Sequence, residues 1–271
     1  MKRLEGKTAI VTGAGSGLGK VTAELFAREN ASVLVADISE DSAKQTADEI
    51  RENGGKVAFI KTDVSIPEEV KLMIETAVKE FGKLDILFNN AGIPGKTLQL
   101  DIAHQDLKDM DPVFDVNLKG TYYGIHYAAP YMVKNGGGSI ISTASVAGCI
   151  GCMGGSYYGV SKSAVIGLTF TAANELGIHK VRVNCVSPGV MRTSFLELLE
   201  KTPEGRKELE QFKSANPCGR LIEPIEAANV VLFLASDESS AVTGQNIMAD
   251  CCTTLQGQPF DADSFFAANP Y

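Results

Sequence analysis

The chain has 271 residues, of which 44% are hydrophobic and 21% charged, a composition typical of a globular protein and not of a disordered or fibrous one. Its formal net charge of −8 argues against nucleic acid and anionic membranes as partners, because both would be repelled on average. No run reaches the roughly 18 apolar residues that span a bilayer, and the amino terminus lacks the features of a signal peptide. Since α/β sheets of this length are commonly single units and no linker divides the chain, we expect one cytoplasmic domain over residues 1–271.

Short runs rich in β-branched residues alternate along the chain with longer stretches of helical spacing. This alternation favours right-handed βαβ crossovers, and therefore a doubly wound, Rossmann-like α/β fold whose seven-stranded parallel sheet carries helices on both faces. Ligands of such sheets bind beyond the carboxyl ends of the strands. In chain order we predict strand Lys7–Val11, helix Leu18–Glu29, strand Ser32–Ala36, helix Asp41–Asn53, strand Lys56–Lys61, helix Pro67–Phe81, strands Leu84–Phe88 and Ser139–Ser142, helix Tyr157–Leu176, strand Val181–Val186, helix Pro224–Ala235 and strand Asn246–Met248.

The helix predicted at Pro67–Phe81 carries the clearest start signals. Ser65 is the expected N-cap, Pro67 lies early in the first turn, and Glu68 and Glu69 are acids that suit a helix N-terminus. We expect this helix to begin close to Ser65.

The stretch at residues 190–217 is less regular, because it mixes large apolar residues with many charges. One interpretation is an insertion of short helices that covers a substrate, and the other is a surface excursion that packs locally. Periodicity does not separate the two.

The cysteines are too few for a disulfide scaffold in a chain of this length. Cys149 and Cys152 have the C-x-x-C spacing of redox and zinc sites, but the three histidines show no matching spacing for a structural zinc. We expect reduced thiols that fill tight places, and no metal site. The six are Cys149, Cys152, Cys185, Cys218, Cys251 and Cys252.

A glycine-rich run follows the first predicted strand and opens the first predicted helix. It reads Thr12-Gly13-Ala14-Gly15-Ser16-Gly17-Leu18-Gly19. Glycines also make ordinary turns, but at this position they let backbone N–H groups approach a pyrophosphate at a helix N-terminus. The run therefore predicts a dinucleotide site that includes Gly13, Ser16, Gly17, Leu18 and Gly19.

The second predicted strand leads into Asp37, 18 residues after Gly19. A carboxylate there can accept hydrogen bonds from the adenosine ribose and would repel the 2′-phosphate of NADP. Neither Ala36 nor Ile38 is a basic residue that could pair with that phosphate. NAD is the expected cofactor, although Asp37 would also suit the N-cap of the next helix.

Small or polar residues end the next two strands as well. Asp63 and Val64 follow the third, and Asn89-Asn90-Ala91-Gly92 ends the fourth. Such residues are common in turns, but at one edge of a parallel sheet they are also what a bound adenine and ribose require. We place Asp63, Val64 and Asn90 in the cofactor site.

Tyr158 and Lys162 are four residues apart, so on a helix they project from the same face. A neighbouring ammonium stabilises phenolate and lowers the pKa of a tyrosine, which would let Tyr158 exchange a proton. This spacing alone is typical of a solvated helix face. However, Ser145 lies thirteen residues upstream at the carboxyl end of a predicted strand, which is the cofactor edge of the sheet.

Taken together, these motifs closely resemble those of the short-chain dehydrogenase/reductase family, from about Leu4 to Asp250. The resemblance rests on the order and spacing of Thr12–Gly19, Asn89–Gly92, Asn117, Ser145, Tyr158-x-x-x-Lys162 and Pro188-Gly189. It implies a nicotinamide-dependent oxidoreductase.

The resemblance also assigns roles. It makes Tyr158 the general acid/base and Ser145 the donor that orients the substrate oxygen. Lys162 would bind the nicotinamide ribose and lower the pKa of Tyr158, and Asn117 would hold a water in the proton relay. Tyr158 and Lys162 thus belong to the cofactor site too. The resemblance further implies structural roles for Thr12 and Asn90, and contacts to the nicotinamide carboxamide for Val190 and Thr193. Ser142, Thr143 and Tyr157 lie close to the catalytic positions, but Ser145 and Tyr158 fit the family's spacing better.

The chain departs from the family pattern near its end, where Asp250-Cys251-Cys252 stands in place of the usual Asp-Gly-Gly. The family commonly forms homotetramers through the helices after Asn117 and around Tyr158 and through the last strand, so the resemblance implies a homo-oligomer, a tetramer or a dimer. The tail at about residues 251–271 either covers a neighbouring subunit or packs on its own. Its aromatic residues are Phe260, Phe265, Phe266 and Tyr271.

The expected substrate is a small hydrophobic or cyclic secondary alcohol, such as a hydroxysteroid, bile acid or terpenoid alcohol, because the candidate pocket walls are mostly apolar. Polyols and sugars are alternative substrates. One alternative is an NADPH-dependent carbonyl reductase of the 3-oxoacyl type, which would place a basic residue near Ser16 or Ile38. Another is a non-catalytic NAD-sensing protein, which would not need Asn117, Ser145 and the Tyr–Lys pair together.

Overall fold

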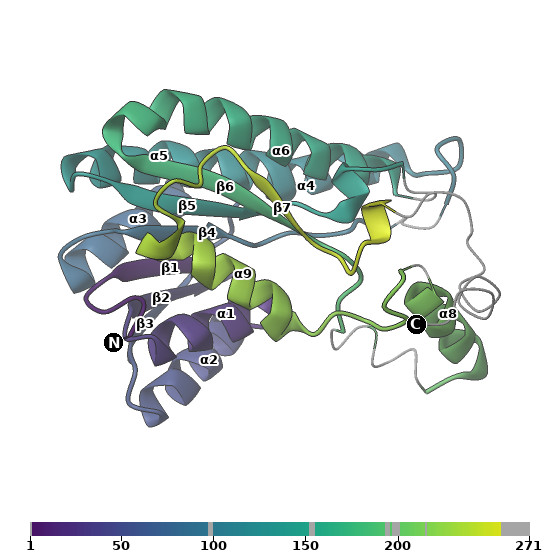
Figure 1. The fold of residues 1–271 in the computed structure, drawn as a ribbon, viewed down its shortest axis with the longest axis horizontal. Helices are drawn as coiled ribbons and strands as arrows, with labels where there is room; N and C mark the ends of the chain where they lie inside the picture. The colour runs from purple at the N-terminus through teal and green to yellow at the C-terminus, as the bar shows by residue number, and fades with distance from the viewer. Residues whose placement is uncertain are drawn as a thin grey trace, which may run out of the picture.

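The parallel sheet is the frame on which the site is built (Figure 1). In the part of the chain that the structure describes it has seven strands in the order β3-β2-β1-β4-β5-β6-β7, and every neighbouring pair is parallel. The chain order reverses between β1 and β4, where doubly wound sheets bind their ligands. The predicted fold class is confirmed. The strands are β1 (Thr8–Thr12), β2 (Ser32–Asp37), β3 (Lys56–Lys61), β4 (Ile86–Asn89), β5 (Gly138–Thr143), β6 (Val181–Pro188) and β7 (Asn246–Ala249).

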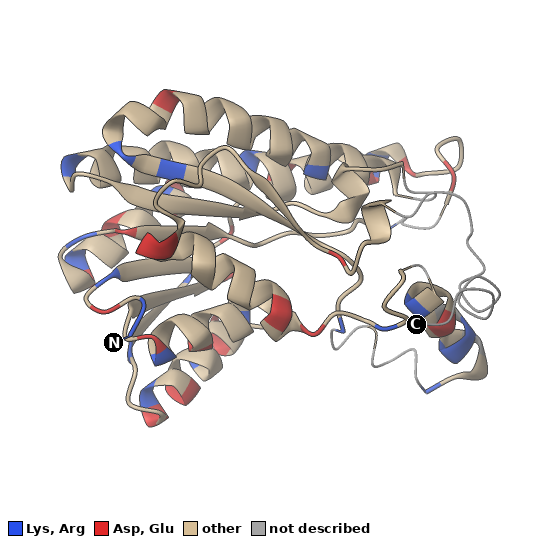
Figure 2. Ribbon diagram, viewed as in Figure 1, with Lys and Arg blue, Asp and Glu red and all other residues tan. Residues whose placement is uncertain are grey.

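The computed structural model describes residues 2–96, 100–151, 155–192, 196, 201–214 and 216–255, with the backbone alone at 204 and 208. Cys152, Thr193 and the aromatic residues of the tail lie outside these ranges. No helix within them is long and apolar enough to cross a membrane, and no three potential metal ligands gather there. Figure 2 shows acidic and basic residues interspersed over the helices, without a continuous basic face in that view.

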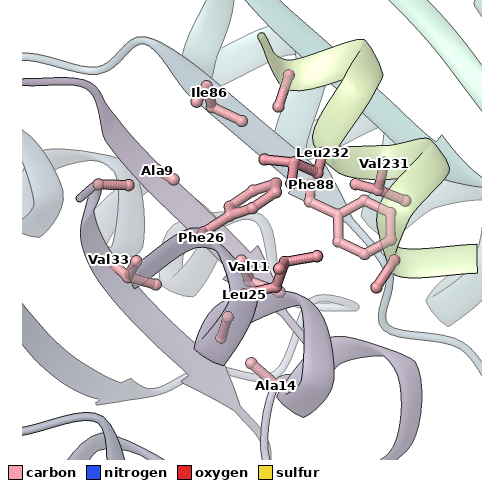
Figure 3. Packing of buried hydrophobic residues seen from close by; sticks show 14 of the residues in the cluster. Ala9, Val11, Ala14, Leu25, Phe26, Val33, Ile86, Phe88, Val231 and Leu232 are labelled. Carbon is pink, nitrogen blue, oxygen red and sulfur yellow. The ribbon is translucent and has the colours of Figure 1, made fainter. Parts of the chain in front are cut away.

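Helices cover both faces of the sheet. One face is covered by α1 (Gly17–Arg28), α2 (Glu40–Glu52) and α9 (Pro224–Ala235). There Phe26 of α1 and Val231 of α9 pack with Phe88 of β4, all fully buried (Figure 3). The opposite face carries α3 (Pro67–Phe81), α5 (Gly120–Lys134) and α6 (Ser156–Leu176), whose buried residues meet Ile10 and Ile140 from the sheet. Strands buried on both faces explain why the sequence reads as short, continuous apolar runs.

One helical region was not singled out by periodicity. The chain forms α4 (Met110–Phe114), a π-helical turn at Asp115–Lys119 and then α5 without a break. Pro130 lies inside α5, where proline normally argues against a helix. Tertiary packing of α5 against α3 and β4 therefore overrides local propensity.

The predicted N-cap of α3 is wrong. The helix begins at Pro67 and its N-cap is Ile66, which forms no side-chain cap. Ser65 instead donates both its backbone N–H and its hydroxyl to Asp63 Oδ1, at 2.9 and 2.6 Å. Proline at the first helical position moves the cap one residue later, and the serine serves the turn that leaves β3.

The segment between β6 and α9 has a small core of its own. Its helix α8 (Pro203–Ser214) lies past the carboxyl ends of the strands in Figure 1. Leu196, Leu209 and Leu221 are buried together, with Val190 and Phe212 packed against them. The stretch thus packs locally at the carboxyl edge of the sheet, and its role as a cover for a substrate stays a prediction.

Candidate active site

The glycine-rich loop connects β1 to α1 and has no room for side chains at its tightest points. Gly13 and Gly17 have φ of +61° and +52°, a conformation that favours glycine. A Cβ on Gly19 would lie 2.1 Å from the Gly13 carbonyl oxygen, and a Cβ on Gly15 would lie 2.6 Å from Ser42 Cβ. Glycine at these positions therefore lets the loop pack closely at the start of α1.

Asn90 and Thr12 hold the loop against β4. Asn90 Nδ2 donates to the carbonyl oxygens of Thr12 and Gly13, at 3.0 and 3.3 Å, and the Asn90 backbone N–H donates to Thr12 Oγ1 at 2.9 Å. Thr143 Oγ1 donates to Asn90 Oδ1 at 3.1 Å. These contacts give both residues a structural part, as the resemblance implied.

Asp37 turns back from the end of β2 toward the glycine-rich loop. Its Oδ2 accepts the Gly15 N–H at 2.8 Å, and its Oδ1 accepts the Ser39 N–H at 2.9 Å. The alternative role of Asp37 as a helix N-cap is wrong, because Ser39 caps α2 by accepting from the Ser42 N–H. The carboxylate is thus held at the rim of the loop.

A hollow of ≈ 360 Å³, here called the β1–β4 hollow, lies at the point where the strand order reverses. Gly19 is absent from its lining because it packs against Gly13 beneath the loop. Thr62, Ala91, Gly92, Ile93 and Val116 also line the hollow, although the sequence analysis did not place them in the cofactor site. The predicted cofactor residues that line it are Gly13, Ser16, Gly17, Leu18, Asp37, Asp63, Val64 and Asn90.

The lining of the β1–β4 hollow suits a dinucleotide. Thr62 is 2% exposed and its hydroxyl has no partner within the protein, so it has a hydrogen bond to offer to a group in the hollow. The Gly13–Gly19 backbone offers N–H groups to a pyrophosphate, and Asp37 offers carboxylate oxygens to a ribose.

Tyr158 and Lys162 lie on one face of α6, with Lys162 Nζ 5.7 Å from the centre of the Tyr158 ring. Lys162 is 3% exposed, and its ammonium donates to the Thr143 carbonyl oxygen at 2.7 Å. Burial lowers the pKa of Lys162 to about 8. The lysine therefore carries a charge that is poorly compensated by solvent and close to a phenol.

Asn117 sits in the π-helical turn and connects three elements. It is fully buried; its Oδ1 accepts the Ile93 N–H at 2.8 Å, and its Nδ2 donates to the Ile93 carbonyl and to Ser161 Oγ, at 2.9 and 3.0 Å. Ser161 Oγ in turn donates to the Tyr158 carbonyl at 2.7 Å. A Cβ on Gly92 would lie 3.1 Å from Asn117 Oδ1 and 3.2 Å from Lys162 Nζ, so both side chains border the hollow at Gly92.

Ser145 follows β5, is 8% exposed and caps a short 3₁₀ turn by accepting the Ala147 N–H at 3.2 Å. This turn packs on α6 through glycine contacts. A Cβ on Gly148 would lie 2.7 Å from the Lys162 carbonyl carbon, and one on Gly159 would lie 2.9 Å from the Ala147 carbonyl oxygen. The serine is thereby held at a set position relative to the helix of Tyr158.

The neighbouring residues that resemble Ser145 and Tyr158 occupy other positions. Ser142 is fully buried in β5, and Thr143 bonds Asn90 and Lys162. Tyr157 is half-buried and has no lysine one turn later on α6.

Comparison with known proteins identifies the family to which this arrangement belongs. Residues 13–254 match the family model described as enoyl-(acyl carrier protein) reductase, which covers most of the chain. The 3-oxoacyl-(acyl-carrier-protein) reductase FabG of Thermotoga maritima is 43% identical over 248 residues, 92% of this chain and 98% of that protein. The chain belongs to the short-chain dehydrogenase/reductase family. It is therefore an oxidoreductase that binds a nicotinamide cofactor.

Other members of the family act on alcohols. The cyclohexanol dehydrogenase of an Acinetobacter species is 41% identical, over 92% of this chain and 95% of that protein. The solved structure of a 7α-hydroxysteroid dehydrogenase complexed with NADH and 7-oxo glycochenodeoxycholic acid superposes with a TM-score of 0.83 at 36% identity, covering 91% of this chain and 93% of that one. The reaction class that these relatives support is an oxidoreductase acting on CH–OH groups.

The buried ammonium of Lys162 makes a pH-dependent contribution to stability. Its folded pKa of about 8 lies below the ordinary lysine value of 10.5, so between these values the unfolded chain binds more protons than the folded one. The free energy of unfolding then rises with pH through this window, and the cost of burying the charge is fully present below it. We expect the unfolding free energy of the wild type relative to Lys162→Met to rise by up to about 3 kcal/mol between pH 8 and 10.5. Denaturant titrations at several pH values measure this difference, and parallel curves for the two proteins would contradict it.

Proposed function

We propose that this protein is an NAD(H)-dependent oxidoreductase that interconverts a secondary alcohol and a ketone, with Asn117, Ser145, Tyr158 and Lys162 as its site. The observation that carries the proposal is that two of these side chains border the β1–β4 hollow, while the other two lie on α6 or in the turn packed against it. Lys162 and Asn117 border Gly92, a lining residue of the hollow, and Ser145 is packed onto the helix that bears Tyr158. A non-catalytic NAD sensor would have no use for this second set of residues.

The proton chemistry belongs to Tyr158. Its hydroxyl takes the proton of an alcohol or gives one to a ketone, and the Lys162 ammonium stabilises the phenolate form. Ser145, held beside α6, donates to the substrate oxygen. Asn117 connects α6 to the segment after β4 through its hydrogen bonds to Ser161 and Ile93. We propose that it also holds the water of the proton relay. A bound nicotinamide supplies the hydride chemistry at the substrate carbon.

The preference for NAD over NADP rests on Asp37. Its carboxylate lines the hollow, is held by Gly15 and Ser39, and is followed by Ile38, which cannot pair with a phosphate. A 2′-phosphate would lie against this negative charge.

Asp37→Ala is expected to move the ratio of kcat/KM for NAD to that for NADP at least about tenfold toward NADP, because it removes about 1.4 kcal/mol or more of repulsion. Initial rates with both cofactors measure it. Asp41→Ala is the matched control: it removes an exposed carboxylate from the first turn of α2 without touching the loop. A wild type that prefers NADP, or equal shifts in both variants, would overturn this role of Asp37.

For the substrate we propose a hydrophobic or cyclic secondary alcohol, such as a hydroxysteroid or a terpenoid alcohol. Leu196, Leu209 and Phe212 give the segment past the strand ends an apolar interior, and relatives include the cyclohexanol and 7α-hydroxysteroid dehydrogenases. The Thermotoga relative supports a second candidate, a 3-oxoacyl-type carbonyl reductase that uses NADPH. A panel of secondary alcohols and β-ketoacyl thioesters, assayed with both cofactors through absorbance of the reduced form, separates the two.

We further propose a homo-oligomer. The outer surfaces of α5 and α6 expose large apolar side chains, among them Tyr122, Val160 and Phe170, which are 53%, 57% and 51% exposed. Apolar side chains gathered on neighbouring helices favour burial against a second subunit.

A further inference from the structure

Thr143 lies at the carboxyl end of β5 and connects the glycine-rich loop with α6. It is the last residue of the strand and pairs with Val186 of β6. Its hydroxyl Oγ1 donates to Asn90 Oδ1 at 3.1 Å, and its carbonyl oxygen accepts the Lys162 ammonium at 2.7 Å. One residue therefore binds both the asparagine that holds the loop and the lysine that lies close to Tyr158.

The Asn90 amide can take only one orientation in these surroundings. Its Nδ2 donates to the carbonyl oxygens of Thr12 and Gly13, at 3.0 and 3.3 Å. The opposite orientation would set the amide oxygen against these two oxygens, and no hydrogen would lie between them. Because Nδ2 uses both of its hydrogens on the loop, the amide oxygen needs a donor from another part of the chain. The Thr143 hydroxyl supplies that donor.

The two carbonyl groups that Asn90 binds lie where β1 passes into the glycine-rich loop. A Cβ on Gly13 would lie 2.9 Å from Ala91 Cα, so the loop packs directly on the segment that carries Asn90. One step further along the loop, the Gly15 N–H donates to Asp37 Oδ2 at 2.8 Å. The position of the loop at the β1–β4 hollow therefore depends on the Asn90 amide.

We propose that Thr143 is a positioning residue for the cofactor: its hydroxyl fixes the Asn90 amide, and the amide in turn sets the glycine-rich loop on the pyrophosphate. The inference rests on the function proposed above, in which this loop binds the phosphates of NAD. Without the hydroxyl, a half-buried amide oxygen loses its donor, and the amide no longer holds the loop in one place.

The same contacts separate binding from chemistry. The Lys162 ammonium binds the backbone carbonyl of Thr143 and not its side chain, so a change of side chain leaves this bond in place. The Thr143 hydroxyl thus acts on the affinity for the cofactor and not on the chemical step.

Thr143→Val removes the hydroxyl and keeps the branched shape of the side chain. We expect the NADH dissociation constant to rise at least about fivefold, because an acceptor is left without its donor, while kcat at saturating cofactor stays within about twofold. Thr143→Ser restores the hydroxyl and should bring the dissociation constant back to within about twofold of the wild type. Calorimetric titration and initial rates measure the two quantities. Unchanged affinity in Thr143→Val, or no recovery in Thr143→Ser, would overturn the inference.

Ser142→Ala is the matched control. Ser142 precedes Thr143 on β5 and is fully buried, and its hydroxyl has no hydrogen-bond partner among the described residues. The substitution therefore removes a hydroxyl from the same strand end without changing a contact of Asn90. We expect the NADH dissociation constant to stay within about twofold of the wild type. Equal losses in Ser142→Ala and Thr143→Val would assign the effect to the packing of β5 and contradict the role of Thr143.

A double-mutant cycle tests whether Thr143 acts through Asn90. Asn90→Ala removes the amide, so Thr143→Val in that background should change the NADH dissociation constant by less than about twofold more. Losses that add in full would show that the hydroxyl acts by another route, which contradicts the inference.

Hydrogen exchange of the protein without cofactor separates this inference from the proposed function. The Gly15 N–H is bound to Asp37, so its exchange rate reports opening of the loop. We expect exchange at Gly15 to be at least about fivefold faster in Thr143→Val than in the wild type and in Ser142→Ala. Equal rates in the three proteins would overturn the positioning role. Faster exchange in Thr143→Val, in a protein whose wild type binds neither NADH nor NADPH, would support the positioning of the loop and contradict the proposed function.

Discussion

Tyr158→Phe should lose turnover by about 10²–10⁴-fold, the contribution typical of a positioned general acid or base. The substitution removes only the hydroxyl, so the ring stays on α6 near Lys162 and no cavity forms. The β1–β4 hollow is untouched because Tyr158 is not among its lining residues. The NADH dissociation constant should therefore stay within about threefold, less than 1 kcal/mol. Stopped-flow turnover and fluorescence titration of NADH measure the two quantities.

Tyr157→Phe is the matched control for this prediction. Tyr157 is the preceding residue, is half-buried like Tyr158, and also lies in the first turns of α6. It has no lysine four positions later, so its hydroxyl lacks a nearby ammonium to stabilise the phenolate. We expect near-normal turnover in this variant. Equal losses in both variants would assign the effect to packing of α6, and turnover close to normal in Tyr158→Phe would refute the mechanism.

The sheet was predictable because each of its signals is local. Strands buried on both faces give short apolar runs, and the loop after β1 needs glycine at Gly13 and Gly17, where φ is positive. The strand ends then brought Asp37 and Asp63 to the same hollow, because parallel strands share one carboxyl edge.

The parts that escaped prediction depend on contacts far apart in the sequence. Asn117 lies in a π-helical turn, and the partners of its side chain are Ile93 and Ser161, which sequence periodicity does not reveal. Thr62 was not assigned to the cofactor site, although its neighbour Asp63 was. A threonine that precedes a strand-end acid could have been assigned there, since its buried hydroxyl has no partner in the protein.

Gly19→Ala should strongly weaken cofactor binding in either form, NAD or NADP. The added Cβ would lie 2.1 Å from the Gly13 carbonyl oxygen and 2.6 Å from Asn90 Nδ2, and neither neighbour is free to move. Gly13 is at φ +61°, and Asn90 is tied to Thr12 and Gly13 by hydrogen bonds. The loop must shift by a large part of a bond length, which moves the N–H groups that face the hollow. We expect the affinity for NADH to fall at least about a hundredfold, or about 2.7 kcal/mol.

Gly177→Ala provides the control, because this glycine ends α6 with φ of −59° and a Cβ there would meet nothing within 4 Å. Both variants replace one hydrogen by a methyl group and have the same effect on the entropy of the unfolded chain, so the difference between them isolates the clash. Calorimetric titration with NADH measures affinity, and thermal unfolding shows whether the fold survives. If Gly19→Ala bound NADH as tightly as Gly177→Ala, the loop between β1 and α1 would not be the phosphate site, and the β1–β4 hollow would have to hold its ligand by other groups.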